Sequence, residues 1–211
     1  AISMETFTKE QVIRTVARMC DIIIENEVPF CELDSVAGDG DFGMSLAKGF
    51  KVVKAEWANH SQEDIGAFLK DCGMIITEHC GGASGPIWGS GFRAMGRYAQ
   101  GKDTLTLAET GEMVQAAIDA VQKRGGAKLG DKTLLDALIP AVESIKASGA
   151  AGESFAVALP KAAAEAVAGG ERTKLIAATK GRASYVGDRS ISFPDDGATA
   201  IGIIFTRLLQ G

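Results

Sequence analysis

The sequence predicts an all-α protein whose helices run up and down beside one another. Apolar residues recur at helical spacing over most of the chain, whereas signals for β-strands are scarce. Glycine-rich turns recur at Gly38, Gly81 and Gly125, separated by 43 and 44 residues, which leaves room for two helices and a polar loop. Connections one helix pair apart return to the same end of such an array, so we expect these turns and the segment 180–199 to meet there. A length of 211 residues fits one domain, 1–211.

The clearest helix signals are two capping boxes, in which a Thr and a residue three positions later exchange hydrogen bonds with each other's backbone. One lies at Thr8–Gln11 and the other at Thr106–Glu109, and each precedes a stripe of apolar residues. Asp131 is expected to cap a further helix, which Pro140 should kink. By the same periodicity, helices are predicted over 43–57, 63–80, 86–99, 154–169 and 173–180.

The segment 199–205 is apolar on every side and rich in β-branched residues. Periodicity alone does not separate a buried strand from a buried helix. We predict a helix because a lone strand would have no sheet to join. Trp57 and Trp88 have helical neighbours and are expected in the core rather than against a ligand.

Composition argues against several classes of function. Lys and Arg number 22 against 27 Asp and Glu, and the resulting net charge of -5 disfavours binding to nucleic acid or to an anionic membrane. The four cysteines show no C-x-x-C spacing and the two histidines lack clustered partners, which favours reduced structural thiols over a zinc site. There is no signal-peptide pattern and no uninterrupted apolar run of about 18 residues, so a cytoplasmic protein is expected.

Three aspartates crowd one glycine-rich turn, the segment 33–43. Asp34, Asp39 and Asp41 repel one another there, and a hard divalent cation such as Mg²⁺ would offset that repulsion through its preference for oxygen ligands. The alternative is turn formation and helix capping, which requires only one Asp. The turn also matches the dinucleotide-binding pattern G-x-G-x-x-G, but no strand precedes it, so a dinucleotide fold is not expected.

Three further loops are candidates for binding an anion. The glycines of 81–86 let backbone amides approach an anion at a helix N-terminus, although close helix packing would explain them equally well. The loop 125–133 is flexible and only weakly specific. The loop 180–189 places three cations around two glycines, which suits phosphate, while a solvated charged loop is the ordinary interpretation. Asp196 has helix capping as its simpler explanation.

Five segments in order, 34–43, 81–86, 130–133, 180–185 and 196–199, together resemble the nucleotide-binding L subunit of dihydroxyacetone kinases. The resemblance spans nearly the whole chain, and five ordered motifs are more specific than any one glycine loop. It implies an eight-helix antiparallel barrel that binds a nucleotide and Mg²⁺ at one end. It also implies a phosphotransferase that works by alignment and charge neutralisation, without a protein nucleophile.

Carried over position by position, the resemblance assigns Asp34, Asp39 and Asp41 as ligands of two Mg²⁺ ions that bridge the phosphates of ADP or ATP. The amides at the start of the following helix would face the phosphates, and Gly125 and Leu134 would lie near the adenine. The residues expected to contact the nucleotide are Phe42, Gly43, Met44, Ser45, Ala83, Ser84, Gly125, Leu134, Arg182, Asp195, Asp196 and Gly197.

The resemblance also implies partners. The acceptor, dihydroxyacetone or a related short ketose, would sit on a separate K subunit, and a second copy of this chain is a further candidate partner. The donor is either ATP or a phosphocarrier M subunit of the phosphoenolpyruvate phosphotransferase system. Phosphocarrier-linked members resemble Gly-Asp-Ala-Asp-His-Gly at the acidic turn, whereas Gly40 and Phe42 here resemble the ATP-using branch and the chain length resembles the other. The alternatives to a kinase subunit are a nucleotide-sensing module and a purely structural helical domain.

Overall fold

The computed structural model describes residues 5–34, 40–177, 191 and 193–210 of the chain. Within these ranges the fold is all-α, as predicted: eight helices of 13 to 19 residues are joined by one short helix of eight residues, two 3₁₀ turns and two strands of two residues each. The α-helices are α1 (Lys9–Glu25), α2 (Glu27–Asp34), α3 (Phe42–Ala55), α4 (Ile65–His79), α5 (Ser84–Tyr98), α6 (Leu107–Gly125), α7 (Leu135–Ala150), α8 (Phe155–Arg172) and α9 (Asp196–Leu208).

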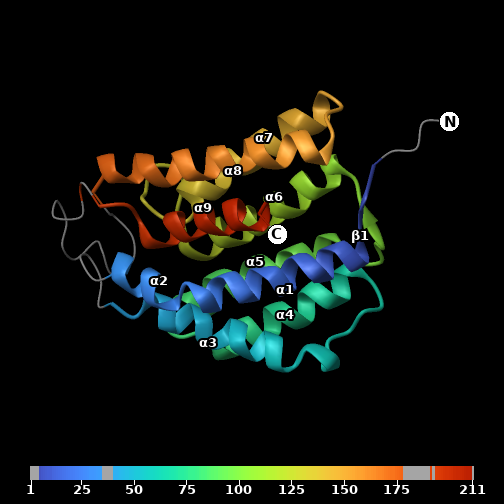
Figure 1. Cartoon of the computed structure of the whole chain (residues 1–211), viewed down its shortest axis with the longest axis horizontal. Coiled ribbons are helices and arrows are strands. Elements are labelled where there is room, and N and C mark those ends of the chain that lie inside the picture. Colours follow the sequence, from blue (N-terminus) through green and yellow to red (C-terminus); the bar gives the residue numbers. More distant parts are fainter. Residues whose placement is uncertain (1–4, 35–39, 178–190, 192, 211) are drawn as a thin grey trace.

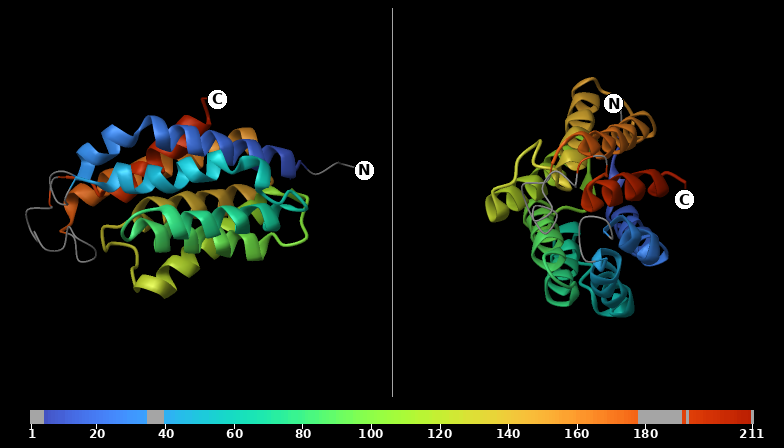
Figure 2. Two further views of the ribbon diagram at one scale, coloured as in Figure 1. Left: turned by 90° about the horizontal axis from the view of Figure 1, so that it is seen from below. Right: turned by 90° about the vertical axis from the view of Figure 1, so that its left-hand side faces the viewer.

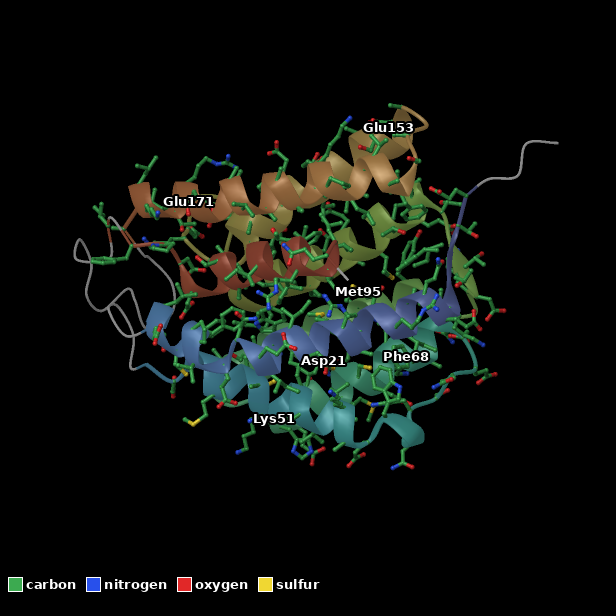
Figure 3. The ribbon with its side chains drawn as sticks, in the orientation of Figure 1. Asp21, Lys51, Phe68, Met95, Glu153 and Glu171 are labelled. Atoms are coloured by element: carbon green, nitrogen blue, oxygen red, sulfur yellow. The ribbon has the colours of Figure 1, made fainter. Side chains whose placement is uncertain are left out.

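The eight long helices close into a ring, and successive members run in opposite directions (Figures 1 and 2). Each long helix packs on the next one along the chain from α3 to α9, α1 packs on α3, and α9 returns to α1. The apolar stripes face inward: Phe50, Phe68 and Leu135 are fully buried, whereas Lys51 and Glu171 lie on the outer surface (Figure 3). The barrel expected from the resemblance is therefore observed, with α2 as an additional short helix.

Both predicted capping boxes form. Thr8 Oγ1 accepts from Gln11 N at 3.2 Å and Gln11 Oε1 accepts from Thr8 N at 2.8 Å, and Thr106 and Glu109 make the same exchange. The strand β1 (Phe7–Thr8) pairs antiparallel with β2 (Thr104–Leu105), a short ladder that was not expected. This ladder brings the starts of α1 and α6 together at one end of the barrel.

Several predicted elements were wrong in detail. Asp131 does not cap α7; its carboxylate accepts from Lys128 N at 2.9 Å, and α7 begins later, at Leu135. The helix predicted over 173–180 is only a 3₁₀ turn over Thr173–Leu175, followed by two non-helical residues, and 178–180 lie outside the described residues. The helix predicted over 199–205 is confirmed inside α9, and Pro140 lies within α7.

The cysteines in the described residues are free, and three of them are packed in the core. Burial raises the pKa of the Cys20 thiol to about 12 and that of Cys80 to about 11, and it raises the pKa of Cys72 as well. These thiols are therefore structural, as predicted. No helix in the described part of the chain is both long and apolar enough to cross a membrane.

Candidate functional site

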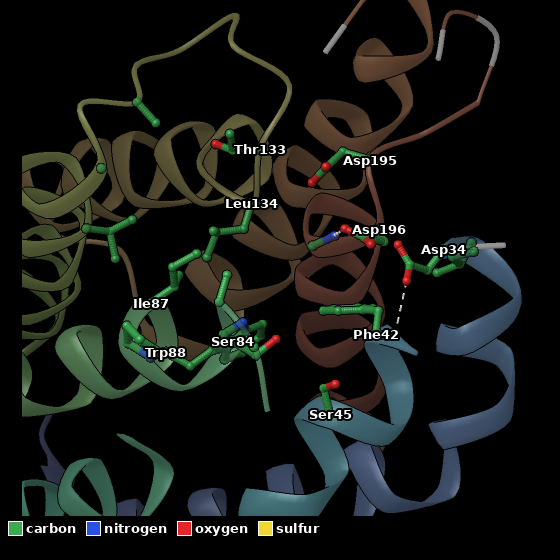
Figure 4. Close-up of a pocket in the computed structure, with 18 of the residues that line it drawn as sticks. Asp34, Phe42, Ser45, Ser84, Ile87, Trp88, Thr133, Leu134, Asp195 and Asp196 are labelled. Atoms are coloured by element: carbon green, nitrogen blue, oxygen red, sulfur yellow. Dashed lines mark hydrogen bonds between the residues drawn. The ribbon is translucent and has the colours of Figure 1, made fainter. Parts of the chain in front are cut away.

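The glycine-rich turns meet at one end of the barrel, as their spacing predicted, around a cavity of about 540 Å³ (Figure 4). Gly38 itself lies outside the described residues, but Asp41, Gly81 and Gly125 all line the cavity. Its volume is within the range of small-molecule sites. The expected site residues that line it are Asp34, Asp41, Phe42, Ser45, Ala83, Ser84, Gly125, Leu134, Asp195, Asp196 and Gly197.

One wall of the cavity is acidic and is organised by Asp34, the last residue of α2. Asp34 Oδ2 accepts three amides, Gly40 N at 3.1 Å, Asp41 N at 3.1 Å and Phe42 N at 3.2 Å, so this carboxylate folds the turn that begins α3 (Figure 4). Asp41 is the N-cap residue of α3 but makes no capping hydrogen bond with its side chain. The third aspartate of the turn, Asp39, lies outside the described residues, and those described contain no group of three potential ligands placed to hold a metal.

Two more carboxylates, at the start of α9, line the cavity across from Asp34. Asp195 caps α9 by accepting from Ala198 N at 2.8 Å, and Asp196 faces Asp34 (Figure 4). Desolvation in the cavity raises the pKa of both carboxyls. Repulsion from Asp195 and a hydrogen bond with the Asp34 carboxyl raise the pKa of Asp196 further. A cluster that retains protons when metal-free has the electrostatics of a cation site.

The helix caps differ between the two ends of the barrel. Helices α1, α4, α6 and α8 begin at the far end, and each is capped by the side chain of its own N-cap residue. Helices α3, α5, α7 and α9 begin at the cavity, and the first three have no such cap. In α3 the Phe42 amide instead donates to Asp34 and the Met44 amide to Cys31 Sγ. The positive ends of the helix dipoles, above all at the start of α5, suit this end of the barrel to phosphate.

The loop before α5 approaches α3 closely. Gly81 N donates to Ser45 O at 3.0 Å, and a Cβ at Gly81 would lie only 3.0 Å from Ser45 Oγ. Gly82 has φ +53°, in the left-handed region that favours glycine. The glycines therefore serve both the turn and close packing, and they place Ala83 and Ser84 at the cavity.

The other wall of the cavity is apolar, and it includes Ile87, Trp88, Val121 and Leu134 (Figure 4). Trp88 was expected only in the core. It is buried and packs edge-on against Phe50 at 6.1 Å between ring centroids, but it also lines the cavity. The surface is thus divided into an acidic, amide-rich part and an apolar part that can accommodate a planar base.

The loop between α6 and α7 contributes residues to the cavity that were not assigned a role from sequence. Lys132 and Thr133 line the cavity, and Asp136 shapes the loop by accepting from Gly130 N at 2.7 Å and from Thr133 N at 2.9 Å. Apart from the expected cap at Asp131 and a weak indication of anion binding in the loop 125–133, the motif 130–133 was singled out for its resemblance. Its function depends on contacts with residues more than 40 positions away, so local sequence holds no signal for it.

Two of the expected nucleotide contacts among the described residues, Gly43 and Met44, do not line the cavity. Gly43 is buried between helices, and a Cβ there would lie 1.9 Å from Glu27 O of α2, so its role is close packing of α2 against α3. Met44 is mostly exposed on the outside of α3. Asp39 and Arg182 lie outside the described residues, and their assignments stay predictions.

Comparison with known proteins decides the family. The family profile described as the DAK2 domain matches residues 36–210. This chain belongs to the DAK2 domain family. The family expected from the five ordered motifs, that of the dihydroxyacetone kinase L subunit, is thereby confirmed.

Individual DAK2 relatives occur as separate subunits and as parts of longer chains. The chain is 36% identical over 203 residues to a protein of Escherichia coli K12 named as the ADP-binding subunit DhaL of a PEP-dependent dihydroxyacetone kinase, and the alignment covers 96% of this chain and 97% of that protein. It is 31% identical over 205 residues to mouse triokinase/FMN cyclase, covering 96% of this chain and 35% of the relative.

A solved structure shows the same fold. The dihydroxyacetone kinase of C. freundii in complex with AMP-PNP and Mg²⁺ superposes with a TM-score of 0.76 at 24% sequence identity. The superposition covers 99% of this chain and 35% of that chain, so this DAK2 chain spans about a third of that kinase's length.

Proposed function

We propose that this chain is the nucleotide-binding subunit of a dihydroxyacetone kinase, which binds ADP or ATP with Mg²⁺ in the cavity and takes part in phosphoryl transfer to a short ketose on a partner K subunit. The main support for the proposal is that the cavity offers a site for a cation and a site for an anion side by side. The carboxylates of Asp34, Asp195 and Asp196 line the cavity together and favour a cation, and the positive end of α5, which has no side-chain cap, favours an anion beside them. A magnesium-bound nucleotide fits both sites.

The residues present fit both groups. Carboxylate oxygens are the donors that Mg²⁺ prefers, and Asp34, Asp39 and Asp41 would hold it. Bound there, Mg²⁺ would supply positive charge to offset the negative charge of the phosphoryl group. The start of α5 would face the phosphates, and the apolar wall with Trp88 would bind the base and exclude water.

The names of the relatives support the subunit role. Relatives at 31% to 36% identity that align over nearly their whole length are named ADP-binding subunits of PEP- or PTS-dependent dihydroxyacetone kinases. By that likeness the donor would be a phosphocarrier, recharging ADP that stays bound. Gly40 and Phe42 in the acidic turn favour ATP instead.

Binding of Mg-ADP measured by calorimetry tests the first half of the proposal. The wild-type chain should bind ADP with Mg²⁺ and lose the binding in EDTA. Asp34→Asn keeps the side-chain volume but removes the charge, so we expect affinity for Mg-ADP to fall on the order of 100-fold, about 2.7 kcal/mol. Asp119→Asn, on the exposed surface of α6, is the matched control and should bind normally. Equal binding in EDTA, or by the Asp34 variant, would refute the metal assignment.

Transfer to a ketose tests the second half. The chain is mixed with a dihydroxyacetone-binding K subunit and supplied with ATP in one reaction and with a phosphorylated carrier protein in the other, and the ketose phosphate formed is measured. Product in either reaction supports the kinase role and identifies the donor. Silence in both, with Mg-ADP binding intact, would favour a nucleotide-sensing module.

A further inference from the structure

Lys132 is a buried lysine at the cavity whose ammonium is fully committed to the protein. It is 3% exposed, and its Nζ donates to the carbonyl oxygens of Thr173 at 2.7 Å, Ile176 at 3.0 Å and Phe193 at 2.5 Å. An ammonium has three N–H donors, so these bonds account for all of its hydrogens. In this arrangement Lys132 therefore does not bind phosphate directly, although it lines the cavity.

The backbone at this position is strained for a lysine. Lys132 has φ +65°, and it is the one non-glycine residue with positive φ in the described part of the chain. Glycine would adopt this conformation without a steric penalty, so the conformation alone gives no reason for a lysine. The carboxylate of Asp136, which accepts from Gly130 N and Thr133 N, holds the loop in shape. Backbone strain that the surrounding structure maintains is typical of functional sites. Here the hydrogen bonds of the lysine side chain explain why a lysine occupies this strained position.

The residues whose carbonyl oxygens bind Lys132 are connected to the aspartates of the acidic wall. Thr173 Oγ1 accepts from Asp195 N at 2.9 Å across 22 positions of the chain, and Phe193 lies two residues before Asp195. Asp195 caps α9, and the next residue, Asp196, faces Asp34. Lys132 thus ties the end of α8 and the approach to α9 to one point. Its charge also attracts the Asp195 carboxylate, which opposes the repulsion from Asp136.

We propose that Lys132 is a positioning residue for the metal–phosphate part of the site: by binding the Thr173, Ile176 and Phe193 carbonyls it sets Asp195 and Asp196 against Asp34. The inference rests on the proposed function, because its consequence is measured as Mg-ADP affinity. It assigns to Lys132 an action through other residues rather than contact with the nucleotide.

Lys132→Met tests the proposal, with Lys128→Met as the matched control. Lys128 lies in the same loop, but its side chain is 77% exposed and pairs with Asp131. In Lys132→Met we expect Mg-ADP affinity to fall at least about 10-fold, the effect of losing a residue that orients ligands, while affinity for adenosine changes by less than about twofold. Amide hydrogen exchange in the metal-free protein should accelerate at Asp195 and Ala198, because the start of α9 is released. Lys128→Met should change none of these.

Two further variants separate the side chain from the backbone and from folding. Lys132→Gly relieves the positive φ yet removes the ammonium, so it should lose Mg-ADP affinity as Lys132→Met does. Thr173→Val removes only the hydroxyl that accepts from Asp195 N, and it should shift affinity and exchange in the same direction if Lys132→Met fails to fold.

The outcomes are distinguishable. Normal Mg-ADP binding by Lys132→Met or Lys132→Gly overturns the positioning role and leaves the proposed function standing. Equal losses for adenosine and Mg-ADP, with uniform acceleration of exchange, show a merely structural lysine and overturn it too. A wild-type chain that does not bind Mg-ADP removes the proposed function and this inference together.

Discussion

At the residue scale, the aspartates of the site make different contacts and have different roles. Asp34 uses one oxygen to fold the turn before α3, which leaves its other oxygen available toward Asp196. Asp195 uses its carboxylate to cap α9. The Asp196 carboxylate accepts from Gly197 N at 2.7 Å and faces a second carboxyl, that of Asp34. Asp196 is therefore the residue whose charge state depends most on whether a cation is bound.

The metal-free protein should lose stability as pH rises. The pKa of Asp196 and of Asp195 is raised above the unfolded value of about 3.9, so between these values the folded state holds more protons than the unfolded state. Stability is then full below the unfolded pKa and declines toward the raised folded values. In EDTA we expect the free energy of unfolding in urea to fall by on the order of 1 kcal/mol between about pH 5 and pH 8.

Asp196→Asn should flatten this pH dependence, and Asp119→Asn, on the exposed surface, should leave it intact. Saturating Mg²⁺ with ADP should flatten it as well, because the cation replaces the proton. Stability that rises with pH over this range in EDTA would contradict the raised pKa of these carboxyls.

The role of a residue could be predicted from the sequence only where a local pattern of residues indicates that role. Three acids in one turn predict a cation site without knowledge of the fold, and Asp34 and Asp41 do line the cavity. Lys132 gave no local signal because its partners are 41 to 61 positions away. The packing role of Gly43 was missed for a similar reason: the residue that requires it to be glycine, Glu27, belongs to α2, a helix that the periodicity did not predict.

At the element scale, the packing of α2 on α3 sets the acidic wall. α2 has eight residues, carries Pro29 and presents one fully buried side chain, Phe30, so it shows little helical periodicity. It is fixed instead by the close approach at Gly43 and by the hydrogen bonds from the turn to Asp34. Helices that begin with capping boxes, by contrast, were located correctly because their signals are local.

Gly43→Ala should damage both stability and the site. The added methyl would overlap Glu27 O, so α2 must shift and carry Asp34 with it, and we expect a loss of about 1–3 kcal/mol in unfolding free energy together with weaker Mg-ADP binding. Gly91→Ala is the matched control. Gly91 lies inside α5, and the added Cβ would come within 4 Å only of Ala117 Cβ of α6, at 3.6 Å. That variant should be neutral or stabilised by up to about 1 kcal/mol. Urea midpoints and calorimetry measure both effects, and equal behaviour of the two variants would refute the packing argument.

At the scale of the whole molecule, the ring of helices concentrates chemistry at one end. Alternating direction brings four helix starts to the cavity, and the spacing of the glycine turns was sufficient to predict that convergence. The contact of α9 with α1 that closes the ring joins the two ends of the chain, and no local pattern specifies it. Exposed large apolar side chains are also uneven: in the described residues, six of the ten lie on elements at the cavity end, namely Val28, Met44, Leu129, Leu175, Ile191 and Phe193.

Under the proposed function, we expect the ketose-bearing partner to dock on this apolar rim, because phosphoryl transfer requires the acceptor to reach the phosphates bound at the same end. Leu175→Asp places a charge on the most exposed rim residue, at 78% exposure. We expect the concentration of K subunit needed for half-maximal ketose phosphate formation to rise at least about 10-fold, since a buried unpaired charge at an interface costs several kcal/mol, while Mg-ADP affinity is unchanged. Met74→Asp is the control, because Met74 is 57% exposed on α4 and does not line the cavity. If both variants need the same amount of partner, the rim is not the docking surface, and the partner must approach the nucleotide by another route.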